Sequence, residues 1–238
     1  MNTPGQFSLL IATRNNHKVG EIRAILGGQF DCLTLNDFPA APKVVEDAAT
    51  FTGNATKKAV ELARWLASTG SAKLDTANLL VLADDSGLEV DALNSAPGVH
   101  SARFAALDSG ATDNSPDAEN NAKLLRLLKD VPEAKRAARF RCVLALTPAQ
   151  LETQSSKLET PASPVCYADE FELQTEIFEG ACEGWIDFAP RGRGGFGYDP
   201  LFIPKGFEQS FAELGEEIKN EMSHRAKALA KLKARLVK

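Results

Sequence analysis

The chain has 238 residues, a hydrophobic fraction of 44%, a charged fraction of 25% and a formal net charge of −5. These values are those of an ordinary globular protein and exclude collagen-like or strongly charged disordered chains. The acidic balance argues against a protein that binds nucleic acid in bulk. No apolar run approaches the ~20 residues that a membrane-spanning helix requires, so we expect neither a nucleic acid nor a membrane as partner.

The N-terminus and the cysteines indicate the compartment. The opening residues, MNTPGQF, lack the basic and apolar regions of a secretory signal peptide. The four cysteines have neither a C-x-x-C pattern nor the spacing of zinc ligands, so reduced thiols are expected. We therefore predict a cytoplasmic protein.

The first half of the chain alternates predicted strands with predicted helices. Strands are expected at residues 7–13 and 30–35, and helices with one apolar face at 19–26 and 55–66. Gly27 follows the first helix at the position of a C-terminal cap. This alternation is typical of an α/β fold.

The junction between the first strand and the first helix is polar. It contains Thr13, Asn15 and Lys18. Helix N-termini bind phosphate through free N–H groups and the positive end of the helix dipole. The same residues also suit a solvated loop with a capping asparagine, so a phosphate site and a plain cap both remain open.

Two adjacent aspartates follow a short apolar strand at residues 79–83. Asp84 and Asp85 lead into Ser86 and Gly87, and ligands of open α/β sheets bind just beyond the carboxyl ends of strands. Two carboxylates at such a point repel each other unless one is protonated or a multivalent cation keeps both ionised. Asp, Ser and Gly are also ordinary turn residues, so a metal site and a plain turn both remain open.

The second half of the chain contains a predicted antiparallel pair and a helical C-terminus. A helix is expected to begin at Pro116, strands are expected at 139–146 and 171–177, and helices fill the chain from residue 210 onward. Residues 147–164 are rich in Ser, Thr, Pro and Gln and are predicted to form an exposed, mobile loop.

A glycine-rich segment covers residues 189–200. Gly192, Gly194 and Gly197 have the spacing of the dinucleotide-binding fingerprint, but that motif must open a helix, which Pro200 blocks here. One RGRGG copy in an acidic chain is poor support for RNA binding. Glycines that let the backbone approach a ligand, beside two aromatic rings that can stack on a base, fit the segment better.

The start of the last helix carries two basic residues. Ser223 is a predicted N-cap, which places His224 and Arg225 in the first turn. Cations are disfavoured there by the helix dipole, so the pair suggests an anionic or carbonyl ligand. Ordinary surface helices also break this rule often.

Six blocks of sequence occur together in a fixed order. They are ATRNNHK (12–18), TFTGNATKKA (50–59), ADDSGLEVDAL (83–93), APGVHSARF (96–104), GGFGYDPLF (194–202) and SHRAKAL (223–229). Together they resemble the inosine/xanthosine triphosphate pyrophosphatase family, the house-cleaning enzymes for non-standard purine nucleotides. The resemblance implies an α/β protein with a long mixed central sheet flanked by helices. It also implies a single catalytic domain (1–238) of two lobes with the substrate cleft between them.

The resemblance further implies chemistry and partners. The expected reaction is hydrolysis of ITP, dITP and XTP to the nucleoside monophosphate and pyrophosphate, with Mg²⁺ as cofactor and a homodimer as the assembly. It implies that Asp85 activates water, that Glu46 and Asp85 bind the metal, and that Asp84 helps to bind it. Substrate contacts are implied at Thr13, Arg14, Asn15, Asn16, His17, Lys18, Lys58, Ser86, Phe196, Gly197, Tyr198, Asp199, Lys219, His224 and Arg225. Gly53 departs from the family, which often has an acidic residue there, so metal binding would depend more on Glu46 and the aspartates.

Two alternatives remain open. A Maf-type nucleotide pyrophosphatase would act on other nucleotides, but the SHR block at 223–225 argues against it. A nucleotide-binding regulator or RNA-binding module without catalysis would not require Asp84, Asp85 and Lys18 together. A panel of nucleoside triphosphates separates the three hypotheses.

Overall fold

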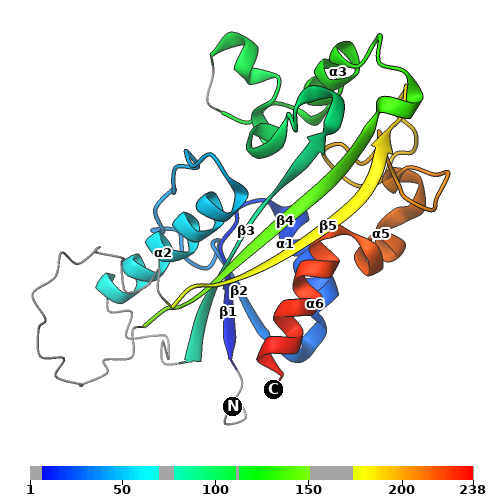
Figure 1. Ribbon diagram of the computed structural model, residues 1–238. Coiled ribbons are helices and arrows are strands. Elements are labelled where there is room, and N and C mark those ends of the chain that lie inside the picture. The colour runs from blue at the N-terminus through cyan, green and yellow to red at the C-terminus, as the bar shows by residue number, and fades with distance from the viewer. Residues whose placement is uncertain (1–6, 70–77, 111–112, 151–173, 238) are drawn as a thin grey trace, which may run out of the picture.

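A six-stranded mixed sheet forms the centre of the protein (Figure 1). The computed structural model describes residues 7–69, 78–110, 113–150 and 174–237. The strands, in the order β2-β1-β3-β4-β5-β6, are β1 (Ser8–Ile11), β2 (Asp31–Thr34), β3 (Leu79–Val90), β4 (Ala137–Pro148), β5 (Glu176–Ile186) and β6 (Phe202–Pro204). β1 pairs in parallel with β2 and β3, whereas the pairs from β3 to β6 are antiparallel. The predicted mixed α/β sheet is therefore confirmed.

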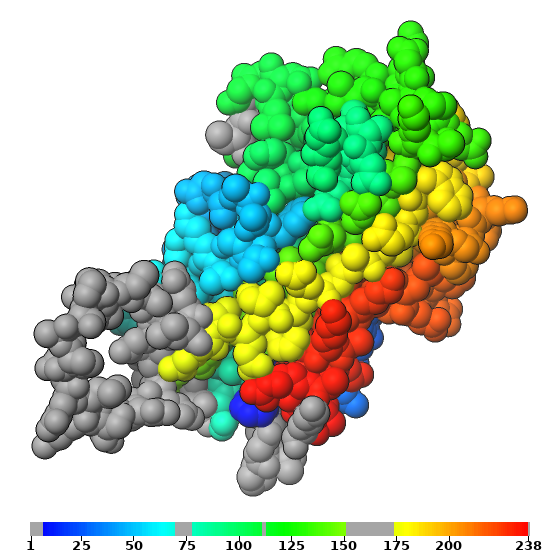
Figure 2. Space-filling model, viewed as in Figure 1, coloured from blue at the N-terminus to red at the C-terminus, as the bar shows by residue number. Residues whose placement is uncertain are grey.

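Helices cover both faces of the sheet. The α-helices are α1 (Asn16–Leu26), α2 (Phe51–Thr69), α3 (Asp117–Leu127), α5 (Phe211–Met222) and α6 (His224–Leu236). Short 3-10 helices are η1 (Gly27–Gln29), η3 (Asp91–Leu93), η4 (Gly98–Arg103), η5 (Ala106–Ser109) and η6 (Glu133–Lys135). Figure 1 shows α2 on one side of the sheet and α6 on the other, and Figure 2 shows β5 as a band across the surface between them. Within the described ranges, no helix is long and apolar enough to cross a membrane.

The two ends of α1 follow from single residues. The side chain of Asn15 accepts hydrogen bonds from the backbone N–H groups of His17 and Lys18, at 2.9 and 3.2 Å. Gly27 ends the helix with φ of 66°, a left-handed conformation that glycine adopts without steric cost. The polar junction therefore does contain the capping asparagine, and the cap places Lys18 in the first turn of the helix.

β3 is longer than the sequence indicated. The expected end of the strand at residue 83, and with it the alternative of a plain turn at residues 85–87, is wrong, because β4 pairs antiparallel with β3 as far as Val90. The parallel neighbour β1 ends at Ile11, which pairs with Leu82. Asp84 and Asp85 therefore lie inside a strand, just past the end of one neighbour, and their side chains point to opposite faces of the sheet.

Other boundaries differ as well. α2 begins a turn earlier than expected, at Phe51, whose side chain is buried. β5 begins at Glu176, whereas the predicted strand began at residue 171, outside the described residues, and two glycines in β5 interrupt the side-chain alternation that would have indicated the strand. The predicted loop at 147–164 starts inside β4, and residues 151–164 lie outside the described part of the chain.

The buried apolar side chains form three clusters. One lies between α2 and one face of β3 and β4, and a second lies between α1, α6 and the opposite face. The third lies at the far ends of the long strands, beside α3 and α5. Because β3, β4 and β5 run through more than one cluster, a single sheet joins the two ends of the molecule (Figure 1).

α6 approaches β5 so closely that only glycine fits at position 180. A Cβ atom on Gly180 would lie 2.1 Å from the carbonyl oxygen of His224 and 2.7 Å from the amide nitrogen of Ala228. We expect Gly180→Ala to lower the free energy of unfolding by about 1–3 kcal/mol, the usual cost of overpacking, as measured by urea denaturation.

Gly20 provides the matched control for this substitution. It is exposed on α1, and a Cβ atom there would meet nothing within 4 Å. Gly20→Ala should therefore raise the free energy of unfolding by about 0.5–1 kcal/mol. If Gly180→Ala were as stable as the unsubstituted protein, the close packing of α6 on β5 would be disproved.

Candidate active site

A cleft of about 980 Å³ opens above the middle of β3. Its walls come from distant parts of the chain: the start of α1, the loop between β2 and α2, η4, the glycine-rich segment and the start of α6. The predicted site residues that line it are Thr13, Arg14, Asn15, Lys18, Glu46, Lys58, Asp85, Ser86, Phe196, Gly197, Tyr198, Asp199, Lys219, His224 and Arg225. The fold therefore brings most of the predicted site to one place.

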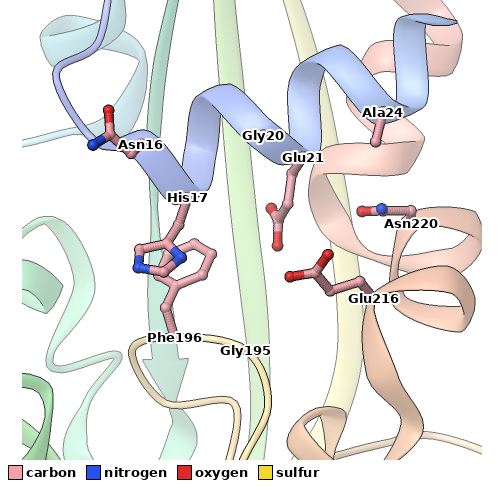
Figure 3. A pocket seen from close by; sticks show the side chains of 9 residues that line it. All are labelled: Asn16, His17, Gly20, Glu21, Ala24, Gly195, Phe196, Glu216 and Asn220. Atoms are coloured by element: carbon pink, nitrogen blue, oxygen red, sulfur yellow. The ribbon is translucent and has the colours of Figure 1, made fainter.

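Asn16 and His17 lie elsewhere. They line a second, smaller pocket of about 190 Å³ (Figure 3). There the His17 ring stacks on Phe196, with ring centroids 5.2 Å apart and an interplanar angle of 17°. Successive residues of a helix point in different directions, so Asn15 and Lys18 reach the cleft whereas the two residues between them do not.

Asp84 is surrounded by cations. Its carboxylate accepts hydrogen bonds from Lys18 Nζ at 2.5 Å, Arg225 Nε at 2.9 Å and the Ser86 hydroxyl at 2.8 Å. Burial by itself would raise the pKa of Asp84, but the charges of Arg225 and Lys18 outweigh burial and hold the pKa well below its ordinary value. Both oxygens are already engaged, so these contacts lend no support to its predicted part in metal binding, which stays a prediction.

Asp85 has different surroundings on the opposite face. Its Oδ1 lies 3.7 Å from Lys58 Nζ, and its Oδ2 is buried without a hydrogen-bond partner among the described residues. Burial raises the pKa of Asp85, and the charges of Lys58 and Lys18 oppose the rise only in part. Lys58 also donates to Glu46 Oε1 at 3.1 Å and to the main-chain oxygen of Asp84 at 2.6 Å. One ammonium group therefore holds two carboxylates near each other.

Glu46 and Asp85 fit a hard divalent cation. Such ions prefer carboxylate oxygens, and the unpartnered Oδ2 of Asp85 is a buried acceptor that lacks a counterpart. In the ranges that the structure describes, no group of three or more His, Cys, Asp and Glu side chains is placed to hold a metal. A small divalent cation is commonly held by one or two carboxylates, with substrate and water completing its shell, which suits this pair.

The loop that carries Glu46 is fixed on the start of α2. The side chain of Asn54, which is fully buried, accepts a hydrogen bond from the amide of Ala48 at 2.9 Å. Gly53 lies against the same residue, and a Cβ atom there would be 2.8 Å from Ala48 Cβ. The glycine that departs from the family pattern therefore lets the Glu46 loop pack closely on α2.

A chain of alternating charges crosses the site. In order of contact it runs Asp199, Lys219, Glu21, Arg225, Asp84 and Lys18. Lys219 Nζ lies 2.5 Å from one carboxylate and 2.7 Å from the next, and the guanidinium of Arg225 likewise contacts a carboxylate on each side. Each buried charge thus has an opposite charge beside it, which offsets the cost of removing it from water.

Glu21 is the central anion of this chain, and it is not among the predicted site residues. It lies three residues after Lys18 in α1 and is buried beside Ile22. Burial would raise the pKa of Glu21, but Arg225 and Lys219 outweigh burial and lower it. A glutamate inside an apolar helical stripe is the signal that could have indicated this role.

The glycine-rich segment forms a loop, as predicted, and Asp199 organises it. Its Oδ2 accepts a hydrogen bond from the Phe196 amide at 2.8 Å. Gly195 lies so close that a Cβ atom there would be 2.2 Å from the same oxygen. Lys219 Nζ lies 4.5 Å from the centre of the Phe196 ring, within the range of a cation–π contact. The aromatic ring is therefore fixed at the edge of the cleft.

His224 is an uncharged group in the same cleft. Its ring stacks on Phe140 with centroids 4.8 Å apart and an angle of 13° between planes. Burial, together with the positive charge of Arg225, lowers the pKa of His224 well below its ordinary value, so the ring is neutral at neutral pH. Its Nδ1 is buried with no partner among the described residues.

The fold and the cleft define a class of protein. A carboxylate pair suited to a divalent cation, cations at a helix N-terminus and an aromatic loop are the parts that a nucleotide-cleaving enzyme requires. The chain belongs to the Ham1 family, whose model matches residues 9–235.

Individual relatives agree with this family. The chain is 44% identical to a dITP/XTP pyrophosphatase of Geobacter sulfurreducens over 229 residues, which cover 96% of each protein. It is 43% identical to a dITP/XTP pyrophosphatase of Desulforamulus reducens over 224 residues, which cover 94% of this chain and 92% of that one. Among solved structures, a HAM1 protein from Coxiella burnetii matches with a TM-score of 0.73 and 33% identity over 98% of this chain and 99% of that one. The resemblance seen in the six sequence blocks is thereby confirmed.

The two neighbouring aspartates should affect stability in opposite directions. The folded pKa of Asp85 lies above the ordinary value of 3.8, so the folded protein binds this proton more tightly than the unfolded chain. The stabilisation that Asp85 contributes to the folded state is therefore lost as the pH rises from 3.8 through the raised pKa of the folded state. We expect Asp85→Asn to melt at a higher temperature than the unsubstituted protein at neutral pH, with the difference vanishing in strong acid. A lower melting temperature at neutral pH would disprove this.

Asp84→Asn should instead be strongly destabilising. Arg225 and Lys18 lower the pKa of Asp84 against the effect of burial. The stabilisation that Asp84 contributes to the folded state is therefore present above pH 3.8 and is lost as the pH falls through the lowered pKa. Without this carboxylate two buried cations lose their shared partner, and we expect the free energy of unfolding at neutral pH to fall by about 3–5 kcal/mol. Urea unfolding of both variants in parallel makes each the control for the other. Equal changes in the free energy of unfolding of the two variants would show that the two aspartates share one environment.

Proposed function

We propose that this chain hydrolyses ITP, dITP and XTP to the nucleoside monophosphate and pyrophosphate. The observation that carries the proposal is the position of Asp85, a buried carboxylate with one unpartnered oxygen at the centre of the cleft, beside Lys58 and Glu46. The cleft volume of about 980 Å³ is adequate for a nucleotide. The names of the relatives, dITP/XTP pyrophosphatases, support the choice of substrate.

The triphosphate binds at the start of α1. Free N–H groups and the positive end of the helix dipole favour an anion there. Thr13 and Asn15 line the cleft at this point, and Lys18 and Lys58 add positive charge from two elements. Arg14 lines the same end of the cleft.

Glu46 and Asp85 hold Mg²⁺ in this proposal. The ion would neutralise phosphate charge and acidify a water bound to it. Asp85 accepts a proton from the attacking water with the carboxylate oxygen that does not hold the ion. The water oxygen bonds to the α-phosphorus, the bond from that phosphorus to the bridging oxygen breaks, and its electron pair leaves with pyrophosphate. The proton on Asp85 then passes to solvent.

The lysines act on charge that develops in this step. As the bond breaks, negative charge accumulates on the departing pyrophosphate, and phosphoryl transfer depends mainly on stabilising such charge. Lys58 lies within the site between the two metal-binding carboxylates, and Lys18 is held by Asp84. Both ammonium groups are therefore in place before the substrate binds.

The base binds among Phe196, His224 and Arg225. Inosine and xanthosine carry a 6-oxo group where adenine carries an amino group. A donor that pairs with the oxo group is left unpaired by adenine, at a cost of about 1–3 kcal/mol per buried group. Arg225 has five N–H donors, and its contacts with Asp84, Glu21 and Ser86 leave one for the base.

Two further parts of the proposal rest on the family resemblance. The protein acts as a homodimer, and it acts in the cytoplasm, where it removes non-standard purine nucleotides from the nucleotide pool. Sedimentation of the purified protein tests the first of these.

A panel of nucleoside triphosphates with Mg²⁺ tests the reaction, with pyrophosphate and phosphate measured separately. We expect pyrophosphate from ITP, dITP and XTP, and kcat/KM for ATP at least ~100-fold lower, as when a site leaves a buried polar group unpaired. Release of single phosphates, or equal rates on ATP and ITP, would overturn the proposal. A preference for pyrimidine nucleotides would favour the Maf-type alternative, and binding without turnover would favour the regulator.

Asp85→Asn tests the assignment of the base. The variant should fold and should lower kcat for ITP by ~10²–10⁴, the scale expected for loss of a base or a metal ligand. Asp108→Asn is the control, because Asp108 is exposed on η5 and neither it nor its partners Lys123 and Arg126 line the cleft. Near-normal turnover of Asp85→Asn with an unchanged Mg²⁺ response would rule out Asp85 as the group that activates water.

A further inference from the structure

The cations that line the cleft fall into two groups. The first group forms ion pairs with carboxylates and consists of Lys18, Lys58, Lys219 and Arg225. The second group, Arg14, Lys43 and Arg103, lines the same cleft and forms no ion pair with a carboxylate in the described part of the chain. Lys43 and Arg103 were not predicted as site residues.

The cations of the second group are gathered around the loop between β2 and α2. Arg14 Nη2 donates to the carbonyl oxygen of Ala41 at 3.0 Å, near the start of this loop. Arg103 Nη2 reaches from η4 and donates to the carbonyl oxygen of Glu46, also at 3.0 Å. Lys43 lies on the loop between these two contacts. The loop therefore brings together cations from opposite walls of the cleft.

Arg103 lies beside the carboxylate pair. Its contact is to the main chain of Glu46, whose side chain is 3.1 Å from Lys58, and Lys58 lies 3.7 Å from Asp85. A guanidinium has five N–H donors in a planar fork that matches phosphate oxygens. Among the described residues its side chain has a hydrogen bond only to this carbonyl, so the remaining donors are available to an anion.

The charge balance of the cleft indicates a role for the second group of cations, Arg14, Lys43 and Arg103. The six residues from Asp199 to Lys18 comprise three cations and three anions, so the alternating chain carries no net charge. A triphosphate carries several negative charges, and its departing pyrophosphate gains more during cleavage. We propose that Arg103, together with Lys43 and Arg14, binds the two phosphates that leave as pyrophosphate. This inference rests on the proposed function and assigns it two further residues.

Product inhibition tests the inference. Arg103→Ala and Lys43→Ala are assayed with ITP, with pyrophosphate and IMP as separate inhibitors. We expect the inhibition constant for pyrophosphate to rise about tenfold or more in Arg103→Ala, as for a lost hydrogen bond to a charged group, and to rise in Lys43→Ala. The constant for IMP, which lacks both phosphates, should not change. Arg103→Lys keeps the positive charge but lacks the planar guanidinium fork. Its inhibition constant for pyrophosphate should therefore lie between those of Arg103→Ala and the unsubstituted protein.

The controls separate this role from a structural one. Arg126→Ala removes an exposed arginine of α3 and should leave both inhibition constants unchanged. Lys43 is exposed and has no hydrogen bond to a described residue, so Lys43→Ala reports on charge without disturbing the Glu46 loop. An unchanged pyrophosphate constant in both alanine variants, or an equal loss of IMP and pyrophosphate binding, would overturn the inference.

Calorimetric titration of pyrophosphate into the Mg²⁺-loaded protein keeps this test independent of turnover. If the unsubstituted protein fails to hydrolyse ITP but Arg103→Ala still weakens pyrophosphate binding, the proposed function fails and the pyrophosphate site stands. If ITP is hydrolysed but pyrophosphate binds equally to all variants, the proposed function stands and the site is disproved.

Discussion

The ion pair between Asp84 and Arg225 determines how the active site is built. It joins β3 to α6 across 141 positions of sequence, and both side chains are only 1% exposed. A buried charge without a partner costs several kcal/mol, so α6 is stable only where its arginine meets this carboxylate. Glu21 and Lys219 extend the pair to α1 and α5, and Asp199 extends it to the glycine-rich loop. One run of charges therefore joins α1, β3, α5, α6 and the glycine-rich loop around the cleft.

Neighbouring residues acquire opposite properties because a strand alternates its side chains between two faces. Asp84 meets cations on one face, and its pKa falls well below the ordinary value. Asp85 is buried on the other face, where burial outweighs the charges of Lys58 and Lys18, and its pKa rises. The first carboxylate stabilises the fold, whereas the second is held in an environment that disfavours its charge. Perturbed groups of the second kind are common at catalytic sites, where reactivity matters more than stability.

The cations that line the cleft differ in their partners. Lys18, Lys58, Lys219 and Arg225 are paired with carboxylates and hold elements in place. Among the described residues, Arg14 and Arg103 have hydrogen bonds only to main-chain oxygens, so these contacts orient the two side chains without neutralising their charge. The loop that anchors both also carries Glu46 and packs on α2 through Gly53. The proposed metal site and the proposed pyrophosphate site therefore share one short segment.

Local features of this protein follow from the sequence alone. The caps at Asn15, Gly27 and Ser223 depend on interactions within a few residues, and the structure has all of them. Most of the predicted site residues also line the cleft, because the family resemblance assigns roles to short blocks that stay intact in the fold.

Other features were decided by contacts between distant residues. The length of β3, and with it the placement of Asp84 and Asp85 on opposite faces, depends on pairing with β4, a strand that begins only at Ala137. The role of Glu21 depends on cations that α5 and α6 bring to it. The spacing of apolar residues in a sequence indicates whether a segment is a helix or a strand. It does not show which charged side chains will meet, because that depends on how the helices and strands pack against one another.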